Sequence, residues 1–325
     1  MNARAIGKQA HSVDSAKTYG RSGVLAIAAA ACVAIPASLL TISPAKAGWR
    51  EDIGVFRIGI VARPGSGATI EGAAEIEKAF ADVLGMRVGI YVARDYGDLV
   101  DAQASARVDY AIHTAASYAT VSIQCGCVLP VVAPVSADGS DGIVSTLIAR
   151  KGGPVNADDI PNYRIAFGPA DSITGALLPL VQFAPNKTPL TGAEPWLVHV
   201  ESEADALAKL KAGEVDAMFG HSGTADEEVL AGSTLDMAQA AGVEEPAVLW
   251  RSRPLHNGPH AVRKSLPAEA RELLEVFLTG LRDDDERVYD YLERRFGGGF
   301  APTVEADFQS AVEMVGAMAG KAPGD

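Results

Sequence analysis

Aromatic residues and positive charge are both scarce in this chain of 325 residues. Phe, Trp and Tyr make up 6% of it while hydrophobic residues make up 48%, so a core must be built mainly from aliphatic side chains. The net charge of −13 disfavours nucleic acid and anionic membrane surfaces as partners. A chain of this length can bury a large core, and two domains are favoured over one.

Cysteine is also scarce, and the common catalytic and metal-binding motifs are missing. Cys125 and Cys127 are separated by a single glycine and could form a disulfide in an oxidising compartment, where we expect a structural or incidental pair. A metal site needs more ligands than this pair supplies nearby, so we expect no metal and no cofactor. There is no zinc spacing, Walker loop or GxSxG elbow, nor a recognisable set of nucleophile, base and orienting residue, so we expect no enzymatic activity.

The first 47 residues have the pattern of a signal peptide. A start containing four basic residues precedes an apolar run over residues 23–42, and Ala45-Lys46-Ala47 places small residues at the two positions that a signal peptidase inspects. An uncleaved membrane anchor is the alternative, but Pro36 inside the run favours cleavage. We therefore expect an exported, acidic, soluble protein in the periplasm.

From Val55 onward, strand patterns alternate with helix patterns. The first set of predicted strands is Val55–Val61, Arg87–Val92 and Val108–Ile112. A second set begins near Lys151, with strands Arg164–Phe167, Trp196–Val200 and Val215–Phe219. This alternation predicts an α/β fold with mainly parallel sheets flanked by helices. We expect two lobes with a ligand cleft between them: residues 53–149 with 251–325 in lobe 1, residues 150–250 in lobe 2, and hinges near Arg150 and Trp250.

The segment Tyr163–Pro179 is the most informative part of the chain. A short β-branched run ending at Phe167 is followed by Gly168-Pro169, and then by Ser172 and Thr174 before an apolar helical run. A helix start presents free backbone N–H groups and the positive end of the peptide dipoles, so it can hold an oxyanion. The alternative is that Ser172 only caps the helix.

Several segments, in order, resemble the periplasmic substrate-binding proteins of phosphonate, phosphite and phosphate ABC transporters, the PhnD-like family. Besides Tyr163–Pro179, the resemblance is carried by DYGDLVDAQASARVDYAIHTAASYA, ADGSDGIVSTLIARKGGPVNADDI, KAGEVDA and LWRSRPLHNGPHAVRKSLP. It spans about Val55 to Leu281. It implies a type II periplasmic binding protein fold that closes on a small anion and delivers it to an ABC permease in the inner membrane.

The resemblance also implies a binding site. Carried over to this sequence, the ligand-binding residues are Tyr96, His113, Thr114, Ser172, Ile173, Thr174, Gly175 and Glu203. Two of them depart from the family pattern, because His113 stands where a tyrosine is usual and Ile173 replaces a hydroxyl residue. Glu203, or Glu201, could contact a ligand amine. His221 and Ser222 follow the strand Val215–Phe219 and are weaker candidates.

His113 leads to a further expectation. A protonated imidazole beside an oxyanion adds a positive charge, so we expect binding to strengthen as the pH falls through the pKa of His113. The alternative is a partly buried histidine at a strand end.

The functional expectation is an exported solute-binding protein, monomeric and with no role in nucleic-acid binding, that captures a phosphonate-, phosphite- or phosphate-like oxyanion for an ABC permease. The alternative is a periplasmic sensor or accessory binding protein of the same fold for a different small organic anion, without a transport role.

Overall fold

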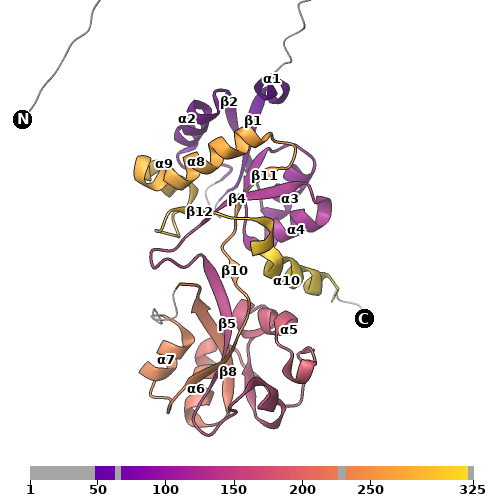
Figure 1. Cartoon of the computed structure of the whole chain (residues 1–325), viewed down its shortest axis with the longest axis vertical. Helices are drawn as coiled ribbons and strands as arrows, with labels where there is room; N and C mark the ends of the chain where they lie inside the picture. The colour runs from indigo at the N-terminus through magenta and orange to yellow at the C-terminus, as the bar shows by residue number, and fades with distance from the viewer. Residues whose placement is uncertain (1–47, 63–66, 226–231, 321–325) are drawn as a thin grey trace, which may run out of the picture. The chain divides into compact units, whose positions relative to one another are not determined.

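The computed structural model describes residues 48–62, 67–225 and 232–320. The predicted signal peptide lies outside these residues. The described chain contains two mixed β-sheets, each with helices packed on it (Figure 1).

The first sheet has six strands in the order β12-β4-β11-β3-β1-β2. Its strands are β1 (Val55–Val61), β2 (Arg87–Ala93), β3 (Tyr110–Ile112), β4 (Val128–Pro134), β11 (His260–Arg263) and β12 (Phe300–Pro302). The associated helices are α1 (Trp49–Ile53), α2 (Ala73–Leu84), α3 (Tyr96–Ala104), α4 (Ala115–Cys125), α8 (Ala268–Asp284) and α9 (Glu286–Leu292).

The second sheet has the order β10-β5-β8-β6-β7, and β9 also pairs with β5. Its strands are β5 (Gly142–Ala149), β6 (Ile165–Phe167), β7 (Leu197–His199), β8 (Ala217–Gly223), β9 (Ala247–Arg251) and β10 (Leu255–His256). Its helical segments are η1 (Ala157–Asn162), η2 (Ile173–Leu177), α5 (Leu178–Gln182), η3 (Pro185–Lys187), α6 (Glu203–Ala212) and α7 (Thr234–Ala240). The chain then ends with η4 (Glu305–Phe308) and α10 (Gln309–Ala319).

The expectation of mainly parallel sheets is only partly met. β1 pairs in parallel with β2 and β3, and β6 with β7 and β8, but the other six described strand pairings are antiparallel. Every antiparallel pairing includes β4, β5, β10 or β11, the strands that flank the two passages between the sheets, because a strand entering a sheet from outside its βαβ units need not run with them.

Strand β5 corrects the expected position of the first crossing. The sequence patterns place residues up to 149 in lobe 1, yet β5 pairs along its whole length with β8 of the second sheet. The chain therefore passes between the sheets after Pro134 and before Gly142, and returns between His256 and His260. The two crossing segments are joined by hydrogen bonds from the Asn257 N–H to the Asp141 carbonyl (2.8 Å) and from Asn257 Nδ2 to the Pro134 carbonyl (2.9 Å).

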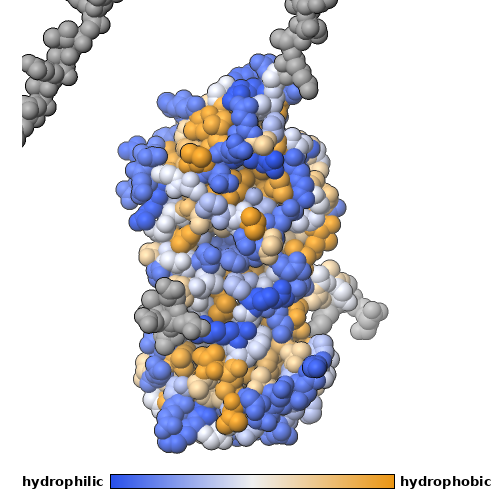
Figure 2. All heavy atoms as spheres, in the orientation of Figure 1, coloured by the Kyte–Doolittle hydropathy of each residue, from blue (hydrophilic) through white to orange (hydrophobic). Residues whose placement is uncertain are grey.

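Each sheet has its own hydrophobic core, in which aromatic side chains pack among aliphatic ones. On the first sheet, Phe80 of α2 and Leu274 and Leu278 of α8 bury against Phe56 and Ile58 of β1. Figure 1 shows α2 and α8 side by side over the strands, and the two helices are in contact. On the face drawn in Figure 2, apolar patches alternate with hydrophilic ones.

Cys125 and Cys127 form a disulfide at the end of α4. Gly126 between them adopts a left-handed conformation (φ 57°) and ends the helix.

Candidate functional site

The helix start predicted at Ser172 lies directly after β6. Ser172 Oγ accepts a hydrogen bond from the Gly175 N–H (3.1 Å), and its carbonyl accepts from the N–H groups of Ala176 and Leu177 (3.0 and 2.9 Å). The first turn is therefore a π-turn that continues into α5. The capping interpretation of Ser172 is correct, but it does not exclude a binding role, because a hydroxyl that accepts one bond can still donate another.

Two glycines allow this turn to pack against the end of β6. A Cβ on Gly168 would lie 3.1 Å from Gly175 Cα, and one on Gly175 would lie 2.8 Å from Ser172 Oγ. The Gly168 N–H donates to the Gly175 carbonyl (3.0 Å), and Ser145 Oγ on β5 donates to the Thr174 carbonyl (2.6 Å). The turn is thus fixed to two strands of the sheet.

The available donors at this turn follow from its geometry. The Gly175 N–H is already paired with Ser172, which removes one of the donors that the sequence suggested. Ile173 and Thr174 occupy the first positions, where N–H groups have no acceptor within the helix. The Ile173 side chain is 38% exposed. Two backbone donors and the hydroxyls of Ser172 and Thr174 remain to hold an anion.

Glu203 lies beside the same turn, at the first position of α6. Ser202 caps this helix by accepting from the Asp205 N–H (3.1 Å). A small cavity of about 20 Å³ is lined by both Glu203 and the turn, through Ser172, Thr174 and Gly175. Space of this size holds about one water molecule, so a larger ligand would have to extend beyond it.

The Glu203 carboxylate is hydrogen-bonded within the protein. His221 Nδ1 lies 2.9 Å from Glu203 Oε1 and 3.0 Å from Oε2, and the Thr234 hydroxyl donates to Oε1. Burial alone would raise the pKa of Glu203, but the hydrogen bonds from His221 and Thr234 outweigh it and lower the pKa. His221 and Ser222 lie inside β8, not after the strand as expected, because β5 continues the pairing as far as Gly223.

The remaining predicted residues form a second group, at the carboxyl ends of β2 and β3. Tyr96 begins α3 and is 42% exposed, and Asp95 caps this helix through the Asp98 N–H (2.7 Å). Thr114 caps α4 in a reciprocal pair with Ser117 (3.1 and 2.9 Å). Because β1, β2 and β3 are parallel, both helix starts lie at the same edge of the first sheet.

His113 is buried, and the expected pH effect is wrong. Its side chain accepts from Ser117 Oγ through Nδ1 (3.0 Å) and donates through Nε2 to Gln103 Oε1 (2.7 Å), while Gln103 donates to the Ala261 carbonyl (3.0 Å). A neutral imidazole satisfies both bonds. Burial lowers the pKa of His113 to about 3, so the ring stays uncharged between pH 5 and 8. Gln103 was missed in the sequence, because a glutamine within a short helix gives no signal of burial.

The comparisons with known proteins decide the family. Residues 58–308 match the family described as "ABC transporter, phosphonate, periplasmic substrate-binding protein". The chain belongs to this family. Accordingly it is an α/β solute-binding protein of an ABC transporter, and the resemblance seen in the sequence is confirmed.

The chain is also similar to several solved structures. One, a binding protein component of an ABC phosphonate transporter from Pseudomonas aeruginosa, is 19% identical and has a TM-score of 0.39, with 78% of this chain and 83% of that chain covered. PhnD1 from Prochlorococcus marinus in complex with methylphosphonate is 14% identical and has a TM-score of 0.42, with coverage of 83% and 99%. Transferrin 1 from Manduca sexta is 10% identical and has a TM-score of 0.54, covering 82% of this chain and 46% of its own. At these identities the likeness concerns the fold alone.

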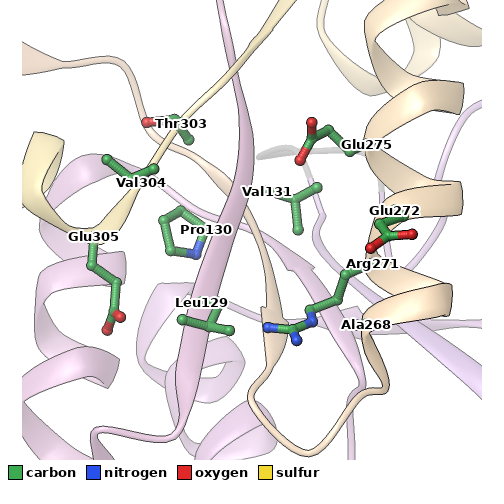
Figure 3. Close-up of a pocket in the computed structure, with 10 residues that line it drawn as sticks. All are labelled: Leu129, Pro130, Val131, Ala268, Arg271, Glu272, Glu275, Thr303, Val304 and Glu305. Atoms are coloured by element: carbon green, nitrogen blue, oxygen red, sulfur yellow. The ribbon is translucent and has the colours of Figure 1, made fainter.

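A larger cavity lies away from the predicted site residues. It has a volume of about 350 Å³ and lies between β4 and α8, where Arg271, Glu272 and Glu275 project from the helix (Figure 3). Its lining includes none of the predicted ligand-binding residues of this binding protein. Size alone therefore does not identify the site.

No helix within the described ranges is long and apolar enough to cross a membrane.

Proposed function

We propose that this binding protein captures a small tetrahedral oxyanion of the phosphonate, phosphite or phosphate class and delivers it to an ABC permease in the inner membrane. The family match supports the transport role. The phosphonate named in the family description supports the ligand class. The protein acts in the periplasm as a monomer and performs no chemistry on its ligand.

The feature that carries this proposal is the turn at Ser172–Thr174. Two hydroxyls and two N–H groups converge at a helix start that hydrogen bonds hold to the sheet. A hydrogen bond to a charged group contributes about 1.5–3 kcal/mol, so three or four together can support micromolar affinity after an association cost of at least ~4 kcal/mol. The overall negative charge of the protein acts weakly here, since salt screens distant charges over about 8 Å.

The ligand lies between two lobes, one built on each sheet. The Ser172 turn and Glu203 belong to the second sheet, and Tyr96, His113 and Thr114 to the first. We place the lobe boundaries at the segments 135–141 and 257–259, where the chain passes between sheets, instead of at Arg150 and Trp250. Ligands of open α/β sheets bind outside the carboxyl ends of the strands, where both groups of residues are found.

A thermal-shift screen tests the ligand class. We expect methylphosphonate, phosphite or phosphate to raise the melting temperature of the mature protein. A ligand at about 100 times its Kd adds about 2.7 kcal/mol of stability, or about 5 °C or more. Sulfonates and carboxylates serve as the competing anions. If no tetrahedral phosphorus oxyanion shifts the transition, the proposal fails.

Variants of the turn test the location of the site. Ser172→Ala combined with Thr174→Ala removes two hydroxyl donors, and we expect the ligand affinity to fall about 100-fold or more. Asn156→Ala is the matched control, because Asn156 caps η1 in the same half of the protein without lining the cavity. It should lower the melting temperature of the free protein but leave the ligand-induced shift intact. An equal loss of binding in both variants would contradict the proposed location.

A further inference from the structure

The hydrogen bonds of His221 determine its charge. Nδ1 faces the Glu203 carboxylate (2.9 and 3.0 Å), and Nε2 lies 2.9 Å from the Gly232 carbonyl oxygen. Both partners can only accept, whereas a neutral imidazole has a single N–H. His221 therefore satisfies both contacts only as the imidazolium cation. The contrast with His113 is clear, since that ring has one donor and one acceptor as partners.

Glu203 is the charged group that contacts this ring. From α7, the Thr234 hydroxyl donates to Glu203 and accepts from the backbone N–H of His221 (2.7 Å). The Asp236 carboxylate accepts from the backbone N–H of Gly232 (3.1 Å). On β5 the residue paired with His221 is Ser145, which is uncharged. The hydrogen bond to Glu203 is the main cause that raises the pKa of His221, in agreement with the geometry.

The position of this ion pair matters because Glu203 lines the same small cavity as Ser172 and Thr174. An isolated carboxylate there would repel an anionic ligand and attract an ammonium group on it. A protonated His221 behind Glu203 cancels that charge and also occupies both carboxylate oxygens. A ligand amine would have to compete with His221 and Thr234 for them.

We propose that the His221–Glu203 ion pair makes this site select tetrahedral oxyanions that carry no cationic amine, so that methylphosphonate, phosphite or phosphate binds in preference to aminoalkylphosphonates. The proposal rests on the oxyanion-binding function proposed above and defines its ligand class. Glu203 then shapes the electrostatics of the site and is not an amine receptor. His221 is a positioning residue that acts through Glu203.

Calorimetric titration of methylphosphonate and 2-aminoethylphosphonate, at one pH, tests this selectivity. We expect the wild-type protein to bind methylphosphonate at least as tightly as the aminated ligand. In His221→Gln the side-chain amide can still donate to Glu203, but the carboxylate charge is no longer cancelled. The ratio of the two affinities should then shift toward 2-aminoethylphosphonate by at least about tenfold.

His199→Gln is the matched control, because His199 ends β7 of the same sheet and is exposed. It should leave the ratio unchanged. A wild-type protein that binds 2-aminoethylphosphonate more tightly than methylphosphonate, or an affinity ratio unaltered in His221→Gln, would overturn the proposal.

A ligand-free measurement separates this proposal from the one on which it rests. NMR of the imidazole nitrogens at about pH 6 should show His221 protonated at both positions, and its pKa should fall in Glu203→Gln. A neutral ring would overturn the ion pair whatever the ligand. If the ring is charged but neither phosphonate binds, the oxyanion function fails and the selectivity fails with it. If both ligands bind and only the ratio disagrees, the selectivity alone is wrong.

Discussion

Three histidines of this binding protein show how the partners of a ring decide its protonation. His113 and His260 are buried, and burial lowers the pKa of each to about 3, whereas hydrogen bonding to Glu203 raises the pKa of His221. The sequence indicated that histidines lie near the site but not which of them could be charged. That property depends on Gln103, Glu203 and Gly232, which are distant in sequence from the rings they contact.

The buried histidines predict an acid-sensitive fold. The unfolded chain binds protons at both positions below about pH 6.5, whereas the folded protein does so only near pH 3. The free energy of unfolding should therefore fall as the pH is lowered from about 6.5 to 5, by up to about 1.4 kcal/mol per pH unit for each ring. The raised pKa of His221 affects stability above this pH window. The charged ring stabilises the folded protein through Glu203, and this stabilisation is lost as the pH rises through the raised pKa.

Urea denaturation at several pH values measures this dependence. His113→Gln should reduce the slope of stability against pH between about pH 5 and 6.5. An unchanged slope in His113→Gln would show that the ring is already charged in the folded protein.

At the scale of elements, helix starts were the easiest features to predict. Ser172 was identified as a helix start, because a cap depends on residues three positions apart. The sheet to which a strand belongs was harder to predict, and β5 was assigned to lobe 1 although it pairs in the second sheet. Its sequence alternates in the same way whichever sheet it joins, and only the pairing with β8 decides.

The packing of Gly168 against Gly175 predicts a specific cost for an added methyl group. Gly175→Ala would place Cβ 2.8 Å from Ser172 Oγ and 3.2 Å from Gly168 Cα. We expect about 1–3 kcal/mol of destabilisation, together with weaker oxyanion binding as the turn shifts. Chemical denaturation and calorimetric titration measure the two effects.

Gly316→Ala is the matched control for this substitution. Gly316 lies inside α10, and beyond its chain neighbours and the backbone of its own helix no heavy atom lies within 4 Å of the added Cβ. There alanine should raise stability by up to about 1 kcal/mol. Equal stability and binding in both variants would show that the two-glycine contact is not required.

At the scale of the whole molecule, the described residues connect the two sheets through the crossing segments and through α10. The crossing segments are joined through Asn257, and α10 packs against both α4 and α5. Ala311 and Met314 of α10 are buried with Ala119 and Leu178, and Glu313 pairs with Arg253. Nothing in the sequence pattern indicated that α10 contacts both the helix that Thr114 begins and the helix that follows Ser172.

If the lobes close on the ligand, the crossing segments must absorb the backbone rotation. Small-angle X-ray scattering should then show a smaller radius of gyration with saturating methylphosphonate. The Ser172→Ala, Thr174→Ala double variant should show no such change at the same concentration. If the radius of gyration of the double variant also became smaller, closure of the lobes would not depend on a ligand bound at the Ser172 turn.

The strand order of the first sheet has a consequence for biosynthesis. β11 lies between β3 and β4, yet it is made only after every strand of the second sheet. While the ribosome is still adding those strands, β3 and β4 have no partner between them, and their open edges can pair with other chains. The half of the protein that is translated first is therefore the half whose sheet is completed last.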